Sequence, residues 1–313
     1  MKNNKQLLGY IYAISAAIIW GVSGNFGQFL FQERAMSIEW LVVIRLLISG
    51  VLLLAFSAAQ KKNDFWLIWK NKKDLFHLIL FAFLGIVAVQ YTYFAAIKHS
   101  NAATATVLQY VGPVLIAVYL AIVNKKLPNP KQSLAIFLAI AGTFLLVTHG
   151  SVKTLSISTA GLVWGLLSAC ALAYYTVKPV RLLNKYPSAL VIGWGMTIGG
   201  IGFSFVHAPW KVSGVWDSYT WAFTVFIIVL GSLISFYIYL SAVKMIGAQT
   251  TSLLASAEPL SATVMAVFWL NVPFVFMDWL GTICIVITIL LLARGDRKGV
   301  WKIPGVLRPG IKS

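Results

Sequence analysis

The chain of 313 residues is 59% apolar and only 11% charged, and its mean hydropathy is +0.84. A soluble domain carries about 25% charged residues, so this composition excludes a soluble globular protein. The net charge of +17 does not indicate nucleic-acid binding, because the lysines and arginines lie between apolar runs and form no single basic face.

Ten apolar runs approach or exceed the length of about 20 residues that a helix needs to cross the hydrocarbon core. We expect membrane helices at residues 8–31, 36–58, 74–97, 101–123, 131–149, 158–182, 187–207, 219–243, 247–270 and 275–293. The basic start resembles that of a signal peptide, but the run behind it is too long and further runs follow, so we interpret it as the first membrane helix. The chain is therefore predicted to be an all-α integral membrane protein with ten transmembrane helices.

The distribution of lysine and arginine predicts the orientation. If the N-terminus is cytoplasmic, the inner segments hold nineteen of these residues and the outer segments hold four, namely Arg34, Lys98, Lys153 and Lys211. We therefore expect a multi-pass plasma-membrane protein with both termini in the cytoplasm. The basic inner loops, and the basic tail at 294–313, are expected to lie against anionic lipid headgroups.

The sequence contains an internal repeat. Residues 84–146 align without a gap to residues 230–292, at a constant offset of 146, and fourteen of the 63 positions are identical. The matched pairs include Gly85/Gly231, Tyr91/Tyr237, Tyr93/Tyr239, Lys98/Lys244 and Pro113/Pro259. The offset places the third to fifth spans on the eighth to tenth, so the repeat unit has five helices, an odd number. We therefore expect two inverted five-helix repeats, at 1–149 and 158–293, as in secondary transporters.

Several motifs together resemble a known family. They are Ala-Ile-Ile-Trp-Gly (17–21), the arginine of Val-Ile-Arg-Leu-Leu (Arg45), the stretch Ala95 to Ala105, and one proline in each half, Pro113 and Pro259. In this order they resemble the EamA-like family of the drug/metabolite transporter superfamily, from about residue 8 to 294. The resemblance implies a transporter of small metabolites, amino acids or organic cations, often acting outward.

The chain departs from this family at one place in each half. The family frequently carries an acidic residue just after the fourth span and again after the ninth. Here those positions read Asn124-Lys125-Lys126 and Asn271-Val272-Pro273. A cytoplasmic gate that depends on those acids is therefore in doubt.

Glu258 is the most informative polar residue, because it lies about halfway along the ninth predicted span, next to Pro259. A carboxylate at the centre of a bilayer costs a few kcal/mol, so it is a functional-site hypothesis by default. Three interpretations compete: Glu258 binds a proton or a cationic substrate, it is a protonated packing residue, or it lines a wet cavity without touching substrate. Its counterpart in the first half is Gly112, so the expected site is chemically asymmetric.

Arg45 lies in the second predicted span, near its outer end. The favoured interpretation is that its side chain extends to the outer headgroups. The alternatives are a substrate carboxylate as partner, or an ion pair within the membrane, for which Glu39 is the nearest candidate.

Other polar and aromatic residues gather at a similar depth. An amide that faces lipid is costly, and aromatic rings can hold a cation or an aromatic substrate. The predicted substrate-binding residues are Trp20, Asn25, Gln90, Gln109, Tyr110, Trp164, Tyr175, Ser235, Tyr239 and Glu258. Glu258 is also the proton-coupling candidate. Pro113 and Pro259 are hinge candidates, with a role in packing as the alternative.

The remaining features are interpreted structurally. Gly161/Gly165 and Gly195/Gly199 have the spacing that brings membrane helices close together. Cys170 and Cys284 are expected to be small buried residues, and no metal or other cofactor is predicted. No enzyme or ATP-binding signature is present, so the leading hypothesis is a secondary transporter, monomeric or homodimeric, that exports an amino acid or organic cation. Transport is either coupled to protons through Glu258 or works by facilitated diffusion. The alternatives are a lipid scramblase or flippase, and a membrane enzyme that modifies lipids.

Overall fold

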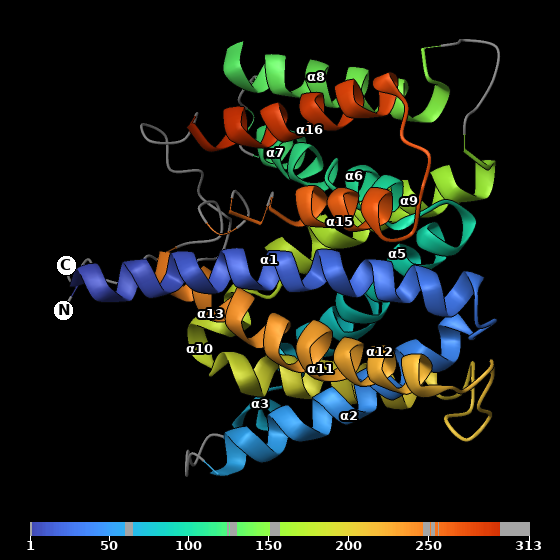
Figure 1. Ribbon diagram of the computed structural model, residues 1–313. Helices are drawn as coiled ribbons and strands as arrows, with labels where there is room; N and C mark the ends of the chain where they lie inside the picture. Colours follow the sequence, from blue (N-terminus) through green and yellow to red (C-terminus); the bar gives the residue numbers. More distant parts are fainter. Residues whose placement is uncertain are drawn as a thin grey trace.

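The computed structural model describes residues 2–59, 65–123, 125, 130–150, 157–246, 251, 254–255 and 257–294. Every regular element in these ranges is a helix (Figure 1). The basic tail predicted at 294–313 lies, apart from Arg294, outside the described residues, as does Asn124.

The helices of the first half are α1 (Lys2–Gln32), α2 (Ile38–Ala59), the short α3 (Leu67–Lys70), α4 (Lys72–Leu80), a π-helical stretch η1 (Phe81–Val87), α5 (Ala88–His99), α6 (Ala102–Gln109), α7 (Gly112–Val123) and α8 (Pro130–Thr148). Asparagines start two of these helices: the side chain of Asn71 accepts from the N–H groups of Lys73 and Asp74, and that of Asn101 accepts from Thr104. Such caps satisfy backbone donors that a helix cannot satisfy itself.

The helices of the second half are α9 (Thr159–Val177), α10 (Val180–Lys185), α11 (Ser188–Phe203), α12 (Ser218–Ile228), a second π-helical stretch η2 (Val229–Ile234), α13 (Ser235–Ile246), α15 (Ala257–Phe268) and α16 (Phe276–Arg294). Both π-helical stretches lie in the middle of long helical rods, one running from Lys72 to His99 and the other from Ser218 to Ile246. The two stretches fall at matching places of the sequence repeat, around Gly85 and Gly231.

Within the ranges given above, five helical segments are long and apolar enough to cross a membrane, and five shorter apolar helices accompany them. The ten predicted spans therefore correspond to apolar helices, but their interiors differ from the prediction in two places. The run at 101–123 is not one helix, because Tyr110 and Val111 separate α6 from α7. In the run at 247–270, Ala255 is a turn residue that follows the helical Leu254, and α15 begins at Ala257.

This interruption changes the interpretation of the two prolines. Pro113 is the second residue of α7 and Pro259 is the third residue of α15. A proline in the first turn of a helix removes no hydrogen bond that the helix would otherwise make. Each proline, a hinge candidate from the sequence, therefore lies in the first turn of a helix and breaks no hydrogen bond within that helix.

Helices from the two halves are interleaved. α2 packs along α11, α8 packs along α16, α1 contacts both α13 and α15, and α5 and α6 both contact α9. In Figure 1, α1 crosses the middle of the molecule, with α2 and α11 on one side of it and α8 and α16 on the other. α1 begins and α16 ends at the same end of the molecule.

Small residues allow the helices to approach closely. A Cβ atom on Gly50 of α2 would lie 2.7 Å from the backbone nitrogen of Thr197 in α11. A Cβ on Gly165 would lie 2.9 Å from the Cβ of Leu108, and one on Gly199 3.3 Å from the carbonyl oxygen of Ala82. The packing role predicted for the glycines of α9 and α11 is thus confirmed.

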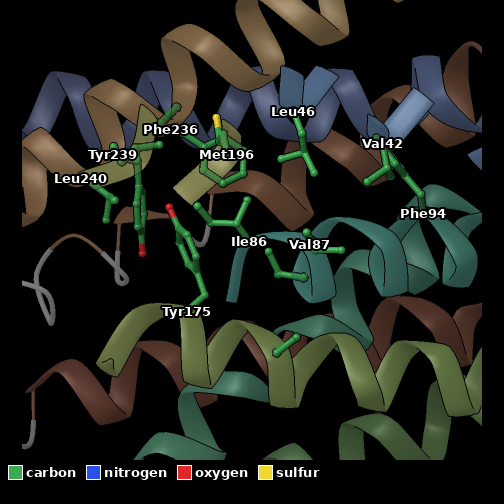
Figure 2. Close-up of a cluster of buried hydrophobic side chains, with 14 of the residues drawn as sticks. Val42, Leu46, Ile86, Val87, Phe94, Tyr175, Met196, Phe236, Tyr239 and Leu240 are labelled. Atoms are coloured by element: carbon green, nitrogen blue, oxygen red, sulfur yellow. The ribbon is translucent and has the colours of Figure 1, made fainter. Parts of the chain in front are cut away.

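Buried side chains from α2, η1, α5, α9, α11 and α13 meet in the centre of the molecule (Figure 2). There the ring of Tyr175 stacks on that of Phe81, with centroids 5.6 Å apart, and meets the edge of Phe236. The cysteines lie elsewhere: Cys170 is exposed and Cys284 partly so, which corrects the expectation that both are buried. Packing like that of Tyr175 with Phe81 and Phe236 is what largely holds membrane helices together, because lipid tails are as apolar as the side chains and the hydrophobic effect does not drive helices to associate.

Candidate functional site

A cavity lies among the helices α1, α2, α5, α6, α9, α13 and α15. It encloses about 510 Å³ of space not occupied by atoms, including the part that opens outward. Its lining comes from both halves of the chain: Trp20, Ser23, Arg45, Val89, Gln90, Tyr93, Phe94, Gln109, Leu172, Tyr175, Phe236 and Glu258. Polar and charged groups thus share one cavity with an apolar wall.

Glu258 is in the first turn of α15 and is almost fully buried. One of its carboxyl oxygens accepts a hydrogen bond of 3.0 Å from the hydroxyl of Tyr110, which also lies against the carbonyl of Ala255. Tyr110 occupies the short break between α6 and α7. Two interrupted spans, one from each half, therefore meet at this carboxyl group.

Arg45 extends from α2 into the same cavity and is only 4% exposed. Its Nε donates to the hydroxyl of Ser232 at 2.7 Å, and Nη2 donates more weakly to the carbonyl of Gly231 at 3.4 Å. Its guanidinium carbon lies 4.8 Å from the ring centre of Phe94, a distance suited to a cation–π contact. The favoured interpretation from sequence, a side chain extending to the headgroups, is therefore wrong.

The π-helical stretch η2 carries the groups that Arg45 contacts. Its backbone hydrogen bonds run from i to i+5 instead of i to i+4, and π-helical turns are frequent at functional sites. The carbonyl of Gly231 accepts from the indole of Trp20 at 3.1 Å as well as from Arg45, and the hydroxyl of Ser232 donates to Ile227 at 2.8 Å. The sequence repeat contains Gly231, but a change of helix type is not visible in it.

Arg45 and Glu258 do not form an ion pair with each other, or with any other group in the described part of the chain. Glu39, the alternative partner considered for Arg45, instead accepts hydrogen bonds from Ser37 and Tyr91. A buried cation and a buried carboxyl group thus line the same cavity without neutralising each other. Such groups are costly in a membrane unless a partner or a ligand compensates them.

Two further groups at the cavity lack partners. Both polar atoms of the Gln90 amide, and the hydroxyl of Tyr175, make no hydrogen bond with the described residues although they are buried. Figure 2 shows the ring of Tyr175 pointing from α9 toward that of Tyr239 on α13. Buried polar groups normally have partners, so unpaired ones that line a cavity are available to a ligand or to water.

The other cavity residues are already engaged. Nε2 of Gln109 donates to the hydroxyl of Ser168 at 2.5 Å, and the indole of Trp20 packs against Phe236 and Tyr239 with ring centres 5.2 and 4.9 Å away. These contacts hold Gln109 and Trp20 in place, so the two side chains define the shape of the cavity that they line.

Of the ten residues predicted from the sequence, five line the cavity: Trp20, Gln90, Gln109, Tyr175 and Glu258. Tyr110 and Tyr239 lie behind it, against Glu258 and Trp20 respectively. The structure places the remaining three away from it.

Each of these three has a local partner. The amide nitrogen of Asn25 donates to the carbonyls of Gly21 and Ala262, which ties α1 to α15. Ser235 donates to Leu230 within its own helical rod, and Trp164 meets the edge of Tyr91.

Sequence reasoning missed Ser23 and Tyr93 at the cavity, as well as its apolar wall. Tyr93 bonds to Thr106 at 2.7 Å, and its membership of a repeated pair, Tyr93/Tyr239, was the one available signal. The apolar residues Val89, Phe94, Leu172 and Phe236 carried no signal, because apolar residues are the background of this chain.

A second hollow lies near the end of α1 opposite its start. It holds about 870 Å³ including its open part, and its polar lining includes Gln28, Thr104, His149 and Asp278. His149 and Asp278 pair at 2.9 Å. Because α1 and α6 contribute to this hollow and to the central cavity, both open spaces share two walls.

A family model and two curated relatives match most of the chain. The sequence model of the EamA-like transporter family matches residues 7–148 and, a second time, residues 159–294. The "Uncharacterized inner membrane transporter YicL" of Salmonella typhimurium is 38% identical over 294 residues, covering 93% of this chain and 96% of that protein. The "Uncharacterized transporter YyaM" of Bacillus subtilis is 24% identical, with 96% of each chain covered.

A solved crystal structure shares the fold, with a TM-score of 0.63 at 19% identity, covering 94% of this chain and 99% of that one. The two family matches and the apolar helices indicate a multi-pass membrane protein. The chain therefore belongs to the EamA-like transporter family.

Proposed function

We propose that this protein is a secondary transporter that carries a small amino acid, or a closely related zwitterion, across the plasma membrane by alternating access. The observation that carries the proposal is that Arg45 and Glu258 line one cavity, both buried and unpaired with each other. The family membership supports transport in general, and the charges at the cavity support this substrate class.

A zwitterion satisfies both groups at once. A substrate carboxylate would bind the guanidinium of Arg45, and a substrate ammonium would bind the carboxylate of Glu258 beside the hydroxyl of Tyr110. A simple cation would leave Arg45 uncompensated, and a simple anion would leave Glu258 uncompensated. The substrate with opposite charges at its two ends is therefore the one that the cavity fits best.

The rest of the cavity suits an amino-acid side chain. Trp20, Phe94, Leu172 and Phe236 provide an apolar wall, and the unpaired amide of Gln90 offers a donor and an acceptor. The enclosed part of the cavity is smaller than 510 Å³, because that volume counts the part that opens outward, so the proposed ligand is small.

Alternating access is supported by features that recur in the two halves at the offset of the sequence repeat. A π-helical stretch surrounds Gly85 and Gly231, a proline lies in the first turn of α7 and of α15, and Lys125 and Asn271 both have positive φ, 49° and 51°. Two halves of opposite orientation would give inward-open and outward-open states of similar energy. Pro113 and Pro259, beside the breaks in their spans, are the proposed hinges.

Orientation and coupling complete the proposal. Both termini are cytoplasmic by the excess of inner lysines and arginines, and the plasma membrane agrees with the printed name of the Salmonella relative. Export is the proposed direction. Once the substrate leaves, the buried Glu258 needs a proton in place of the ammonium, which would couple transport to protons.

The test is uptake by proteoliposomes of L-alanine, its methyl ester and its N-acetyl derivative, with and without a pH gradient. We expect the free amino acid to be preferred at least tenfold over both derivatives, since each lacks one charge. Arg45→Gln should remove the discrimination against the ester, and Glu258→Gln the discrimination against the N-acetyl compound and the response to the pH gradient.

Two exposed residues serve as matched controls, Lys178→Gln for the cation and Glu33→Gln for the carboxylate. Neither should alter the preference. If the ester is carried better than the amino acid, the substrate is an organic cation and the zwitterion proposal fails. If no amino acid of any size is carried or bound, the substrate class is wrong.

The inverted topology has its own test. Single cysteines at Lys125 and Asn271, in a chain without Cys170 and Cys284, should react with a membrane-impermeant reagent from opposite sides of the bilayer. Labelling of both from one side would refute the inverted repeat, whatever the substrate.

A further inference from the structure

A basic hollow lies between α3, the start of α4 and the end of α10. It measures about 970 Å³ including its open part, and the residues that matter in it are Lys70, Lys72, Lys73, Asp74, Lys185 and Tyr186. Figure 1 places α10 toward the end of the molecule where α1 begins, the end that the lysine distribution assigns to the cytoplasm. The hollow is separate from the central cavity and shares no residue with it.

The one acid of this hollow is already neutralised. The side chain of Asp74 is 1% exposed and accepts from the ammonium of Lys185 at 3.0 and 3.2 Å and from the hydroxyl of Tyr186 at 3.0 Å. Arg181 lies 3.6 Å from its other side. In contrast, Lys70, Lys72 and Lys73 are exposed and form no ion pair with a described residue. The hollow therefore presents an uncompensated positive charge.

An apolar stripe continues from these lysines along the same helical rod. Phe76, Ile79 and Phe83 are exposed and follow one another at steps of three and four residues, which places them on one face. Lys72 and Lys73 precede Phe76 by one turn, so they cap this stripe. The rod from Lys72 to His99 is long and apolar enough to cross a membrane, so the stripe faces acyl chains.

Exposed tryptophans mark the level of the membrane surface. Trp66 directly precedes α3 and Trp69 lies within it, close to the lysines in the sequence, and both tryptophans are exposed. Tryptophan is enriched at the headgroup level, because its ring is amphipathic and suits the boundary between water and the apolar core. The hollow thus combines cations at the depth of lipid phosphates with an apolar track at the depth of lipid tails.

We propose that this hollow is a binding site for an anionic phospholipid. The phosphate lies among Lys70, Lys72 and Lys73, and an acyl chain lies along Phe76, Ile79 and Phe83. A free phosphate would use the lysines equally well but would gain nothing from the apolar stripe. The continuity of the two features is what favours a lipid over a soluble anion.

The experiment is native mass spectrometry of the purified protein with phosphatidylglycerol or phosphatidylcholine of identical acyl chains. The protein should retain one phosphatidylglycerol more tightly than phosphatidylcholine. Each lysine near a membrane surface changes affinity for an anionic lipid by about fivefold. The double variant Lys72→Gln/Lys73→Gln should therefore weaken phosphatidylglycerol binding by at least about fivefold and leave phosphatidylcholine unchanged.

The matched control is Lys125→Gln/Lys131→Gln, which removes two exposed lysines from the same predicted side of the membrane. It should bind phosphatidylglycerol like the original protein. The proposal is overturned if the control weakens binding as much, or if the Lys72/Lys73 variant binds normally. Glycerol phosphate, the headgroup without chains, separates the two sources of phosphate: if it displaces the lipid at the lipid's own concentration, the site binds a soluble anion instead.

Discussion

The approach of α1 to α15 behind Glu258 makes a strong prediction for Gly21→Ala. A Cβ at Gly21 would lie 2.8 Å from the carbonyl oxygen of Glu258 and 2.8 Å from the backbone nitrogen of Ala262. It would also displace the hydroxyl of Ser261, which donates to Glu258 at 2.9 Å. These atoms belong mostly to the backbone, so the helix itself must move.

Two opposing free-energy terms decide whether Gly21→Ala raises or lowers the stability of the protein. Alanine in place of glycine inside a helix gains about 1 kcal/mol. Overpacking costs about 1–3 kcal/mol, and backbone contacts place Gly21 at the upper end. We expect a net loss of about 1–2 kcal/mol in the free energy of unfolding. At Gly27 of the same helix the nearest atoms are ring carbons of Phe94 and Phe31, at 3.0 and 3.4 Å, which can rotate away. Gly27→Ala should therefore be close to neutral.

The assay is thermal unfolding of both variants in the same detergent, followed by amino-acid binding. Gly21→Ala should melt several degrees below Gly27→Ala and should bind substrate more weakly, because α15 carries Glu258. A Gly21→Ala protein as stable as the original would refute the close packing of α1 on α15 and the reasoning built on it.

Three further predictions concern single groups. Ser232→Ala removes the acceptor of a charged hydrogen bond from Arg45, so the apparent substrate affinity should fall about tenfold. The control Ser235→Ala should leave the affinity unchanged, because the Ser235 hydroxyl bonds to Leu230 within its own helical rod. Equal effects of the two variants in a binding titration would argue against a positioning role for Ser232. Asp74→Asn should lower the melting temperature more than Lys185→Gln does, because Arg181 and Tyr186 still hold the carboxylate in the latter, and the reverse order would contradict the cluster. The N–H and hydroxyl of Thr220, and then Arg34, hold the pKa of Asp217 below its usual range, so its contribution to stability is present above about pH 4 and is lost as the pH falls through the lowered pKa. Asp217→Asn should remove that acid-dependent part of a melting curve, and an unchanged pH profile would show that the Arg34–Asp217 pair does not contribute.

The sequence could predict the membrane helices and the polar residues that stand out in them. Glu258, Gln90 and Gln109 are conspicuous because polar groups are expensive in apolar runs, and all three line the cavity. The same argument pointed to Asn25, whose amide is used to join α1 to α15. Because an unpaired polar side chain in lipid costs free energy, the sequence predicts that such a side chain has a partner. It does not say whether that partner is a ligand or a neighbouring helix.

Arg45 and the two prolines could not be placed from the sequence, for related reasons. The Arg45 side chain donates to Ser232 and Gly231, which are distant in the chain and lie in η2, a change of helix type that the sequence does not reveal. The position of each proline within its span depends on where a helix begins, and Tyr110 and Ala255 show no composition that marks a break. Helix type and helix ends inside an apolar run are decided by tertiary contacts.

The widened turns of η1 and η2 have a mechanical consequence. Each fits surplus backbone into a helix that otherwise advances 100° per residue. If that surplus migrated along the rod, the residues that it passed would rotate about the helix axis by roughly 100°, the turn of one residue, without breaking the rod. In the second half, migration of the π-helical turn into α13 would rotate Phe236 and Tyr239 about the helix axis while α12 stayed packed against α2. The residues that line this side of the central cavity could then change without a movement of the whole helix.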